Sequence, residues 1–219
     1  MLAAARRQPS AILLAAQLGA VLLYPFLKDN GAGRALFSAF GIAILGLVVL
    51  AVRSSPGLTW VSILLALPAT ILLLIQAVTG SDDLLPYSSA LEAALYFYAA
   101  FALIAYMLAD HVITKDELFA VGATFTLVAW AFAYLYTVCQ AIDPGSFTAA
   151  VHPDADRTWM ELLFLSFTTL SSTGLSDVVP VMPHARSIVM IEQLAGVGYV
   201  AMVVSRLVAL TVLRRPDPD

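Results

Sequence analysis

Apolar residues along the chain gather into six long segments that are separated by short polar breaks. The segments run approximately over residues 10–27, 35–52, 58–78, 89–109, 118–140 and 185–213. Each is near the length of ~20 mostly apolar residues that a helix needs to cross a membrane. Glycine, proline, serine and aspartate mark the breaks, where they favour turns and helix caps. The pattern predicts an all-α integral membrane protein with six transmembrane helices.

The connection between the fifth and sixth segments is longer than the others and contains a further apolar block, residues 159–170. This block is too short to cross the bilayer, so we expect it to enter the membrane and return. Asp154, Asp156 and Thr158 are candidate caps for a short helix over 158–170. The Ser- and Thr-rich run that follows cannot face lipid, because its backbone groups would lack hydrogen-bond partners there. We therefore predict a re-entrant pore helix and a filter loop.

Composition agrees with a membrane location. The chain of 219 residues is 61% hydrophobic and 12% charged, which leaves too little polar surface for a soluble domain of this size. A net charge of -4 and the lack of a basic stripe argue against a nucleic-acid partner. The single cysteine, Cys139, excludes an internal disulfide and a cysteine-based metal site, and we interpret it as a small core residue.

Basic residues fall mainly on one side of the predicted membrane. That side holds Arg6, Arg7, Arg53, Lys115, Arg214 and Arg215, whereas Lys28, Arg34 and Arg157 fall on the other. Because short cytoplasmic loops carry an excess of Lys and Arg, we expect both termini in the cytoplasm and the protein in the cell membrane. A cleaved signal peptide is the alternative for the first segment, but its apolar run is longer than a usual signal core, and we favour a retained helix.

Two crossings around a short helix and a Thr-rich loop with a glycine resemble the pore module of the tetrameric potassium-channel superfamily. The match is carried by Ser166-Phe-Thr-Thr-Leu-Ser-Ser-Thr-Gly174, Asp177, Pro180, Arg186, Glu192 and Gly196. It covers about residues 118–213. The resemblance implies a homotetramer in the lipid bilayer that passes K⁺ or Na⁺, with no cofactor and no metal beyond the permeating monovalent cations. We expect a four-helix membrane domain over 1–115 and a pore domain over 116–215.

The loop departs from the family's filter, which reads Thr-Val-Gly-Tyr-Gly-Asp. The aligned residues here are Ser172, Thr173, Gly174, Leu175, Ser176 and Asp177. A residue other than glycine costs ~1–2 kcal/mol in the left-handed conformation, so Ser176 should reshape the outer half of the filter. The inner half can still form rings of carbonyl oxygens. The expected activity is passive cation conduction with altered or weakened potassium selectivity. The alternative is a collapsed loop that does not conduct.

Neighbouring residues are expected to support or flank this loop. Phe164 and Leu165 stand where the family commonly has tryptophans that brace the filter. The Thr173 hydroxyl lies where Thr168 or Thr169 could pair with it. Asp177 is expected at the outer mouth, either in an exposed ring of four carboxylates or buried against a donor.

The last segment carries the other candidate residues. Gly196 and Gly198 lie midway along it, where the family often has a hinge, and close helix packing is an equal alternative. Glu192 is costly in a membrane unless it is paired, so we expect it to respond to pH or to bond to the back of the pore helix. Arg206 is expected to extend to the cytoplasmic surface.

Other function classes are less well supported. No Lys or Arg occurs between Arg53 and Lys115, so the first four helices cannot be a conventional voltage sensor. No nucleophile with a nearby base indicates an enzyme. A secondary transporter would commonly carry paired interrupted helices, and only one interrupted segment is present. A non-conducting or accessory membrane protein of potassium-channel type remains the main alternative.

Overall fold

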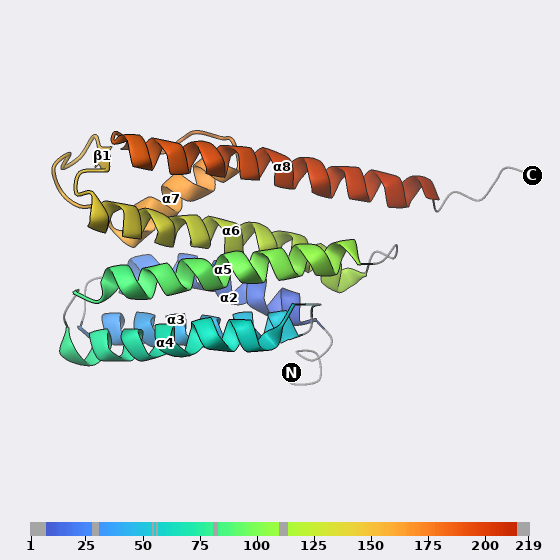
Figure 1. Ribbon diagram of the computed structural model, residues 1–219, viewed down its shortest axis with the longest axis horizontal. Coiled ribbons are helices and arrows are strands. Elements are labelled where there is room, and N and C mark those ends of the chain that lie inside the picture. Colours follow the sequence, from blue (N-terminus) through green and yellow to red (C-terminus); the bar gives the residue numbers. More distant parts are fainter. Residues whose placement is uncertain are drawn as a thin grey trace, which may run out of the picture.

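Seven helices and two short strands occur in the computed structural model, which describes residues 8–27, 31–53, 55, 57–80, 83–109 and 114–213. The helices are α2 (Pro9–Leu27), α3 (Gly31–Arg53), α4 (Thr59–Thr79), α5 (Leu85–Leu108), α6 (Lys115–Ile142), α7 (Trp159–Leu170) and α8 (Pro183–Leu213). The strands are β1 (Phe147–Ala149) and β2 (Val178–Pro180). The long helices run side by side, and α7 lies at an angle between α6 and α8 (Figure 1).

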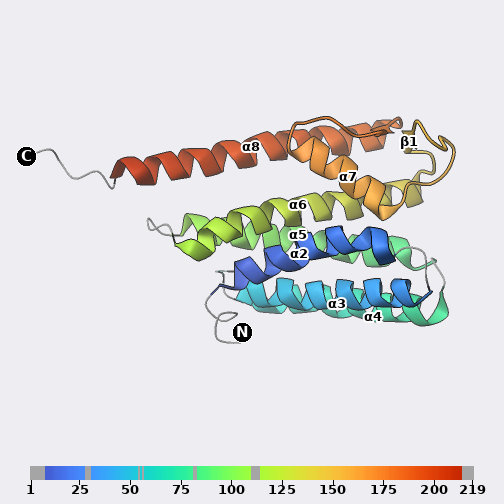
Figure 2. The same ribbon diagram turned by 180° about the vertical axis from the view of Figure 1, so that it is seen from behind.

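Five helices in the described parts of the chain, α2, α4, α5, α6 and α8, are long and apolar enough to cross a membrane. In α3 the stretch that qualifies as apolar, Ala39–Arg53, is shorter. α3 nevertheless runs alongside α2 and α4 (Figure 2). The sixth crossing stays a prediction.

Capping boxes define the first residues of α6 and α7. The Thr114 hydroxyl accepts the N–H of Glu117 at 3.2 Å, and the Glu117 carboxylate accepts the N–H of Thr114 at 3.2 Å. Thr158 and Glu161 repeat this arrangement at the start of α7, with distances of 3.4 and 2.6 Å. Each box satisfies two backbone donors that a helix start leaves free. The short helix expected over 158–170 is confirmed at Trp159–Leu170, and Thr158 is its cap.

Helices α2 to α5 form one group, α6 to α8 form another, and the two groups meet along α6. α2 to α5 pack against one another in sequence, and both α2 and α5 contact α6. Leu95 and Tyr96 from α5 join Leu127 and Trp130 from α6 in a buried core. The predicted domain boundary at residues 115 and 116 lies at the start of α6. The group of helices α2 to α5 therefore packs against α6 of its own chain.

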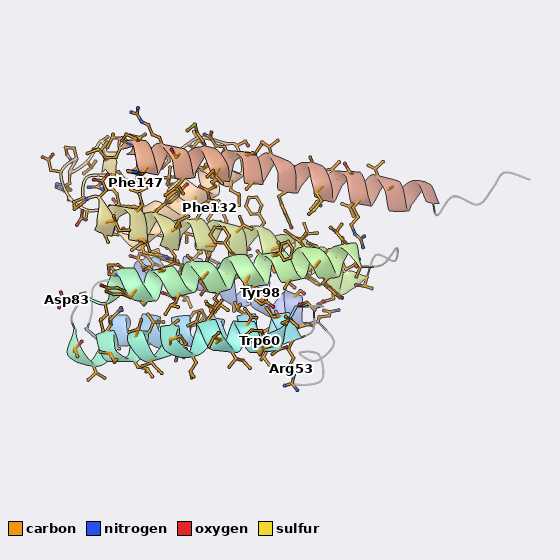
Figure 3. The ribbon with its side chains drawn as sticks, in the orientation of Figure 1. Arg53, Trp60, Asp83, Tyr98, Phe132 and Phe147 are labelled. Carbon is orange, nitrogen blue, oxygen red and sulfur yellow. The ribbon has the colours of Figure 1, made fainter. Side chains whose placement is uncertain are left out.

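The two ends of the bundle differ in their charged residues. α2 and α6 start at the same end, as the hydrogen bond of 3.0 Å from the Ser10 hydroxyl to the Asp116 carboxylate shows. Arg53 and Trp60 lie towards this end, and Asp83 lies at the opposite end (Figure 3). Arg6, Arg7, Lys28, Arg214 and Arg215 lie outside the described residues.

A small antiparallel sheet adds to the expected all-α class. β1 pairs with β2 so that Phe147 lies opposite Pro180 and Ala149 opposite Val178. Strands of three residues give too short a pattern for sequence analysis, and they form because backbone groups outside the helices need hydrogen-bond partners. Phe147 and Val178 are buried in a cluster with Cys139, which is the core residue that the sequence predicted. The sheet joins the chain before α7 to the chain after the candidate filter loop.

Candidate functional site

The candidate filter loop begins where α7 ends and returns to β2 in seven residues, 171–177. Its first backbone N–H groups turn back to the end of α7. Ser172 donates to the Thr169 carbonyl at 3.0 Å, and Thr173 and Gly174 donate to the Thr168 carbonyl at 3.0 and 3.1 Å. These bonds satisfy carbonyl groups that a helix end leaves free. They fix the inner half of the loop to α7.

The carbonyl oxygens on the same stretch of the loop differ from its N–H groups in their hydrogen bonding. None of those of residues 172–175 accepts a hydrogen bond from any residue that the structure describes. Residues 171–175 are also exposed in the single chain, and Leu175 is 78% exposed. The inner half of the loop therefore directs its donors inward to its own helix and leaves its acceptors without partners.

The backbone strain in the loop lies at Ser172, which the sequence did not single out for strain. Ser172 and Gly174 have φ values of 60° and 66°, and Ser176 is not among the described residues with positive φ. The Ser176 hydroxyl instead accepts the N–H of Val178 at 3.1 Å, because the chain is already extending towards β2. The absence of a left-handed conformation at Ser176 agrees with the expectation that a serine there gives the outer half of the loop a different shape. The residue in the costly conformation is Ser172.

Threonine side chains around the loop make contacts with the main chain. The Thr173 hydroxyl lies 3.3 Å from the Thr168 carbonyl oxygen and 3.0 Å from the Ser171 hydroxyl. The Thr168 hydroxyl itself donates to the Leu165 carbonyl at 2.9 Å. Thr169 is buried, and its carbonyl holds the loop. Thr168, one of the two partners expected for the Thr173 hydroxyl, contacts it through its carbonyl oxygen, and Ser171 is a further partner.

Phe164 and Leu165 point to different surroundings. Leu165 is 4% exposed and belongs to the cluster that contains Phe147 and Val178. Phe164 is 47% exposed in the single chain and does not join a buried cluster there. Asp177 is exposed at the outer end of the loop and lines a hollow of about 430 Å³. Asp177 is thus not buried within its own chain, and the ring of four carboxylates stays a prediction.

Glu192 contacts the back of α7, as one of its two expected roles required. It is fully buried in α8, where the Ser166 hydroxyl of α7 contacts Oε1 and the Tyr136 hydroxyl of α6 contacts Oε2. Sequence analysis did not single out Ser166 or Tyr136 as its partners. Their separations from Glu192 are 26 and 56 residues, so no local pattern joins them.

The two glycines of α8 have different surroundings. A Cβ atom at Gly196 would lie 2.1 Å from the carbonyl oxygen of Leu170, the last residue of α7. Nothing lies within 4 Å of the same point at Gly198. Residue 196 therefore needs a glycine for close approach of the two elements, while the chain itself places no such demand on residue 198.

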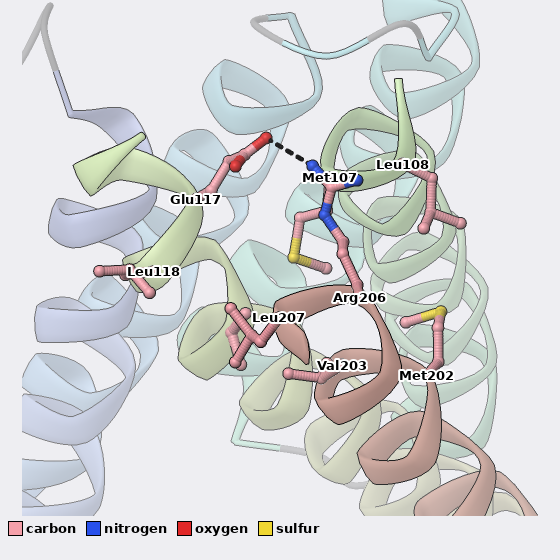
Figure 4. Close-up of a pocket in the computed structure, with 9 residues that line it drawn as sticks. Met107, Leu108, Glu117, Leu118, Met202, Val203, Arg206 and Leu207 are labelled. Atoms are coloured by element: carbon pink, nitrogen blue, oxygen red, sulfur yellow. Dashed lines mark hydrogen bonds and ion pairs between the residues drawn. The ribbon is translucent and has the colours of Figure 1, made fainter. Parts of the chain in front are cut away.

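Arg206 forms an ion pair within the protein, and its expected extension to the cytoplasmic surface stays a prediction. Its Nη2 lies 3.2 Å from Glu117 Oε1, and the two side chains are 16% and 6% exposed. Met107, Met202 and Leu207 surround the pair with apolar atoms (Figure 4). Glu117, in the first turn of α6, is thus the partner of the Arg206 guanidinium within the protein. The pair joins the inner end of α8 to the first turn of α6.

The loop before α7 is held by Arg157. Its Nε donates to the Ala155 carbonyl at 3.0 Å, and its other nitrogens donate to the carbonyls of Val151 at 3.4 Å and His152 at 2.5 Å. Glu161 lies 3.5 Å away as its ion partner. The planar guanidinium group of Arg157 thus holds together the loop that leads into α7. Among the described residues, no group of three or more His, Cys, Asp or Glu side chains is placed to hold a metal ion.

Two membrane-length helices, α6 and α8, flank the short helix α7 and its returning loop, and the class that this fold defines is a multi-pass membrane protein. A family model described as an ion channel matches residues 93–212, which is more than half of the chain. The protein therefore belongs to this ion channel family, which is of the two-transmembrane, potassium-channel-like type. Comparison with curated proteins and with solved structures gave no match. The matched region contains α6, α7 and the candidate filter loop.

Proposed function

We propose that this protein is one subunit of a homotetrameric cation channel, potassium-channel-like, with altered or weakened potassium selectivity. One chain supplies one loop, and a filter of carbonyl rings needs several loops around a common axis. The family match supports ion conduction. Four copies in the cell membrane, each with six crossings and both termini in the cytoplasm, complete the proposal.

The observation that carries this proposal is the separation of donors from acceptors in the candidate filter loop. The N–H groups of Ser172, Thr173 and Gly174 are bound by α7, and the carbonyls of residues 172–175 accept no hydrogen bond from the described part of the chain. Free carbonyl oxygens are suitable ligands for a dehydrated monovalent cation. The carboxyl end of α7 lies beside them, where the helix dipole adds negative potential.

Altered selectivity is supported by the residues that replace the family's pattern. Leu175 is 78% exposed in the chain and offers no hydroxyl group to brace the loop. Ser176 takes no left-handed conformation, so the outer half of the loop leaves the filter path towards β2. The inner residues, from Ser172 to Gly174, are therefore the proposed cation sites, and Asp177 is placed at the outer mouth.

Passive flux from liposomes tests the proposed function. Purified protein in liposomes should release a K⁺ gradient faster than empty liposomes and faster than the Gly174→Asp variant, which puts a side chain and a charge on the loop. A parallel Na⁺ measurement gives the selectivity, and Leu175→Tyr with Ser176→Gly should raise the K⁺ to Na⁺ ratio. Fluxes equal to those of empty liposomes for both ions would contradict the proposal and favour a non-conducting or accessory protein.

A further inference from the structure

A chain of hydrogen-bond contacts crosses the protein behind α7. It runs from the Tyr136 hydroxyl to the two carboxyl oxygens of Glu192 and on to the Ser166 hydroxyl. The Ser166 oxygen also lies 2.8 Å from the carbonyl oxygen of Ala129. All four residues are buried, and Glu192, Tyr136 and Ser166 are each 0% exposed. The chain therefore links α6, α8 and α7 and returns to α6 without contact with water.

The number of protons in this chain depends on the state of the carboxyl group. There are three contacts, and the hydroxyl groups of Tyr136 and Ser166 bring only two protons. If Glu192 were ionised, the single hydroxyl proton of Ser166 would have to be shared between two acceptors, the Glu192 carboxylate and the Ala129 carbonyl. If Glu192 carries a proton, Tyr136 donates to Glu192, Glu192 donates to Ser166, and Ser166 donates to Ala129. Only the protonated form gives every contact its own proton.

The charges around Glu192 lead to the same state. Within the described residues, no Lys, Arg or His forms an ion pair with Glu192. Arg206 is paired with Glu117, and Arg157 is paired with Glu161. Tyr136, which contacts Glu192, belongs to a buried cluster that also contains Cys139 of α6. A buried carboxylate without a cation is costly, so the group is held neutral.

The contact at Ser166 acts close to the candidate filter loop. Ser166 lies one helical turn before Leu170, and the carbonyls of Thr168 and Thr169 between them hold the N–H groups of the loop. A rotation of α7 at Ser166 would therefore move the loop. We propose that Glu192 is a protonated acid that acts as a positioning residue, tying α7 to α6 and α8 so that the loop keeps its conducting geometry. Its effect on conduction rests on the proposed function, whereas its protonation does not.

Infrared spectroscopy tests the protonation of Glu192 independently of flux. The spectrum of the purified protein in D₂O at neutral pH should contain a carbonyl band of a protonated carboxyl group that Glu192→Gln removes. Glu92→Gln is the matched control, because Glu92 is also a buried acid, on α5, at 2% exposure. The band that Glu192→Gln removes must remain in that control. A spectrum of Glu192→Gln that loses no such band would overturn the inference.

Flux tests the positioning role. Glutamine can accept from Tyr136 and donate to Ser166, so Glu192→Gln should keep cation flux within about twofold of the unchanged protein. Leucine fills a similar volume without polar atoms, so Glu192→Leu should lower flux by about tenfold or more. Loss of flux in the glutamine variant as well would show that the charge is needed and would overturn the neutral acid. Unchanged flux in the leucine variant would overturn the positioning role.

Two controls keep these outcomes separate. If Glu192→Leu does not assemble, Ser166→Ala replaces it, since it removes one oxygen from the chain of contacts and should also lower flux. Ser166→Ala with unchanged flux would contradict the positioning role. If the unchanged protein conducts no cation at all, the proposed function fails, and the infrared band still decides the state of Glu192.

Discussion

The backbone of Gly196 in α8 lies directly against the carbonyl oxygen of Leu170 at the end of α7. A Cβ atom at position 196 would approach this oxygen to 2.1 Å, a distance that real contacts do not reach. The end of α7 and the start of the candidate filter loop are therefore in contact with α8 through main-chain atoms. A single methyl group would separate them.

Gly196→Ala should destabilise the protein, and Gly198→Ala should not. Both changes raise helix propensity by ~1 kcal/mol, so their difference reports the contact with Leu170. Overpacking of this kind costs ~1–3 kcal/mol. We expect a lower thermal midpoint for Gly196→Ala than for Gly198→Ala in the same detergent. Equal midpoints would mean that α7 can move away from α8 at no cost.

Gly174→Ala should lower cation flux, whereas Gly145→Ala should not, although both variants should lose similar stability. Gly174 has φ of 66°, and Gly145, in the loop after α6, has φ of 80°. Alanine costs ~1–2 kcal/mol at either position, and nothing lies within 4 Å of the added Cβ at either one. Thermal midpoints of the two variants should therefore fall by similar amounts. Flux should fall by about tenfold only in Gly174→Ala, because only that strain acts on the loop. Equal fluxes in the two variants would count against a filter at Gly174.

Removal of Arg206 alone should lower the free energy of unfolding more than removal of both members of its ion pair with Glu117. Arg206→Met leaves Glu117, with its side chain 6% exposed, without this counter-ion, and loss of one partner of a buried pair costs ~3–5 kcal/mol. Glu117→Gln with Arg206→Met leaves no charge from the pair and keeps an oxygen that can cap Thr114. The double variant should recover more than half of the lost free energy of unfolding, measured by denaturation in micelles. A double variant as unstable as Arg206→Met would exclude this account.

Arg157→Lys should loosen the loop before α7. The arginine holds three carbonyl groups of residues 151–155, and a lysine cannot reproduce its planar fork. Hydrogen exchange of the backbone over residues 151–157 should therefore become faster. Arg186→Lys is the control, because Arg186 is exposed and donates to one carbonyl, that of Pro180, at 3.2 Å. The inference fails if both variants exchange at the rate of the unchanged protein.

Features that depend on neighbouring residues could be predicted from the sequence. The apolar segments and the short helix before the loop follow from the length of each hydrophobic run. Thr158 was among the candidate caps because capping side chains lie within one turn of the groups that they bind. The tie between Glu192 and the back of α7 is an exception, because it joins distant residues and was predicted from the cost of an unpaired acid in a membrane, without its partner Ser166.

Features that depend on distant pairs could not be predicted in the same way. The ion pair of Arg206 was not predicted, because nothing in its own segment indicates Glu117, which is 89 residues away. The sheet between β1 and β2 joins two runs of three residues, too short for a pattern. The left-handed conformation of Ser172 was not predicted, because the path of the loop is set by its bonds to α7.

The bonds from residues 172–174 to the end of α7 also bear on which sign of charge the loop can accept. All three N–H groups of this stretch are already occupied by carbonyl oxygens of α7. An approaching chloride ion would meet oxygen lone pairs there and no main-chain donor. In the proposed channel, discrimination against anions at this point would thus arise from the folding of the main chain onto its own helix, and it would require no acidic side chain.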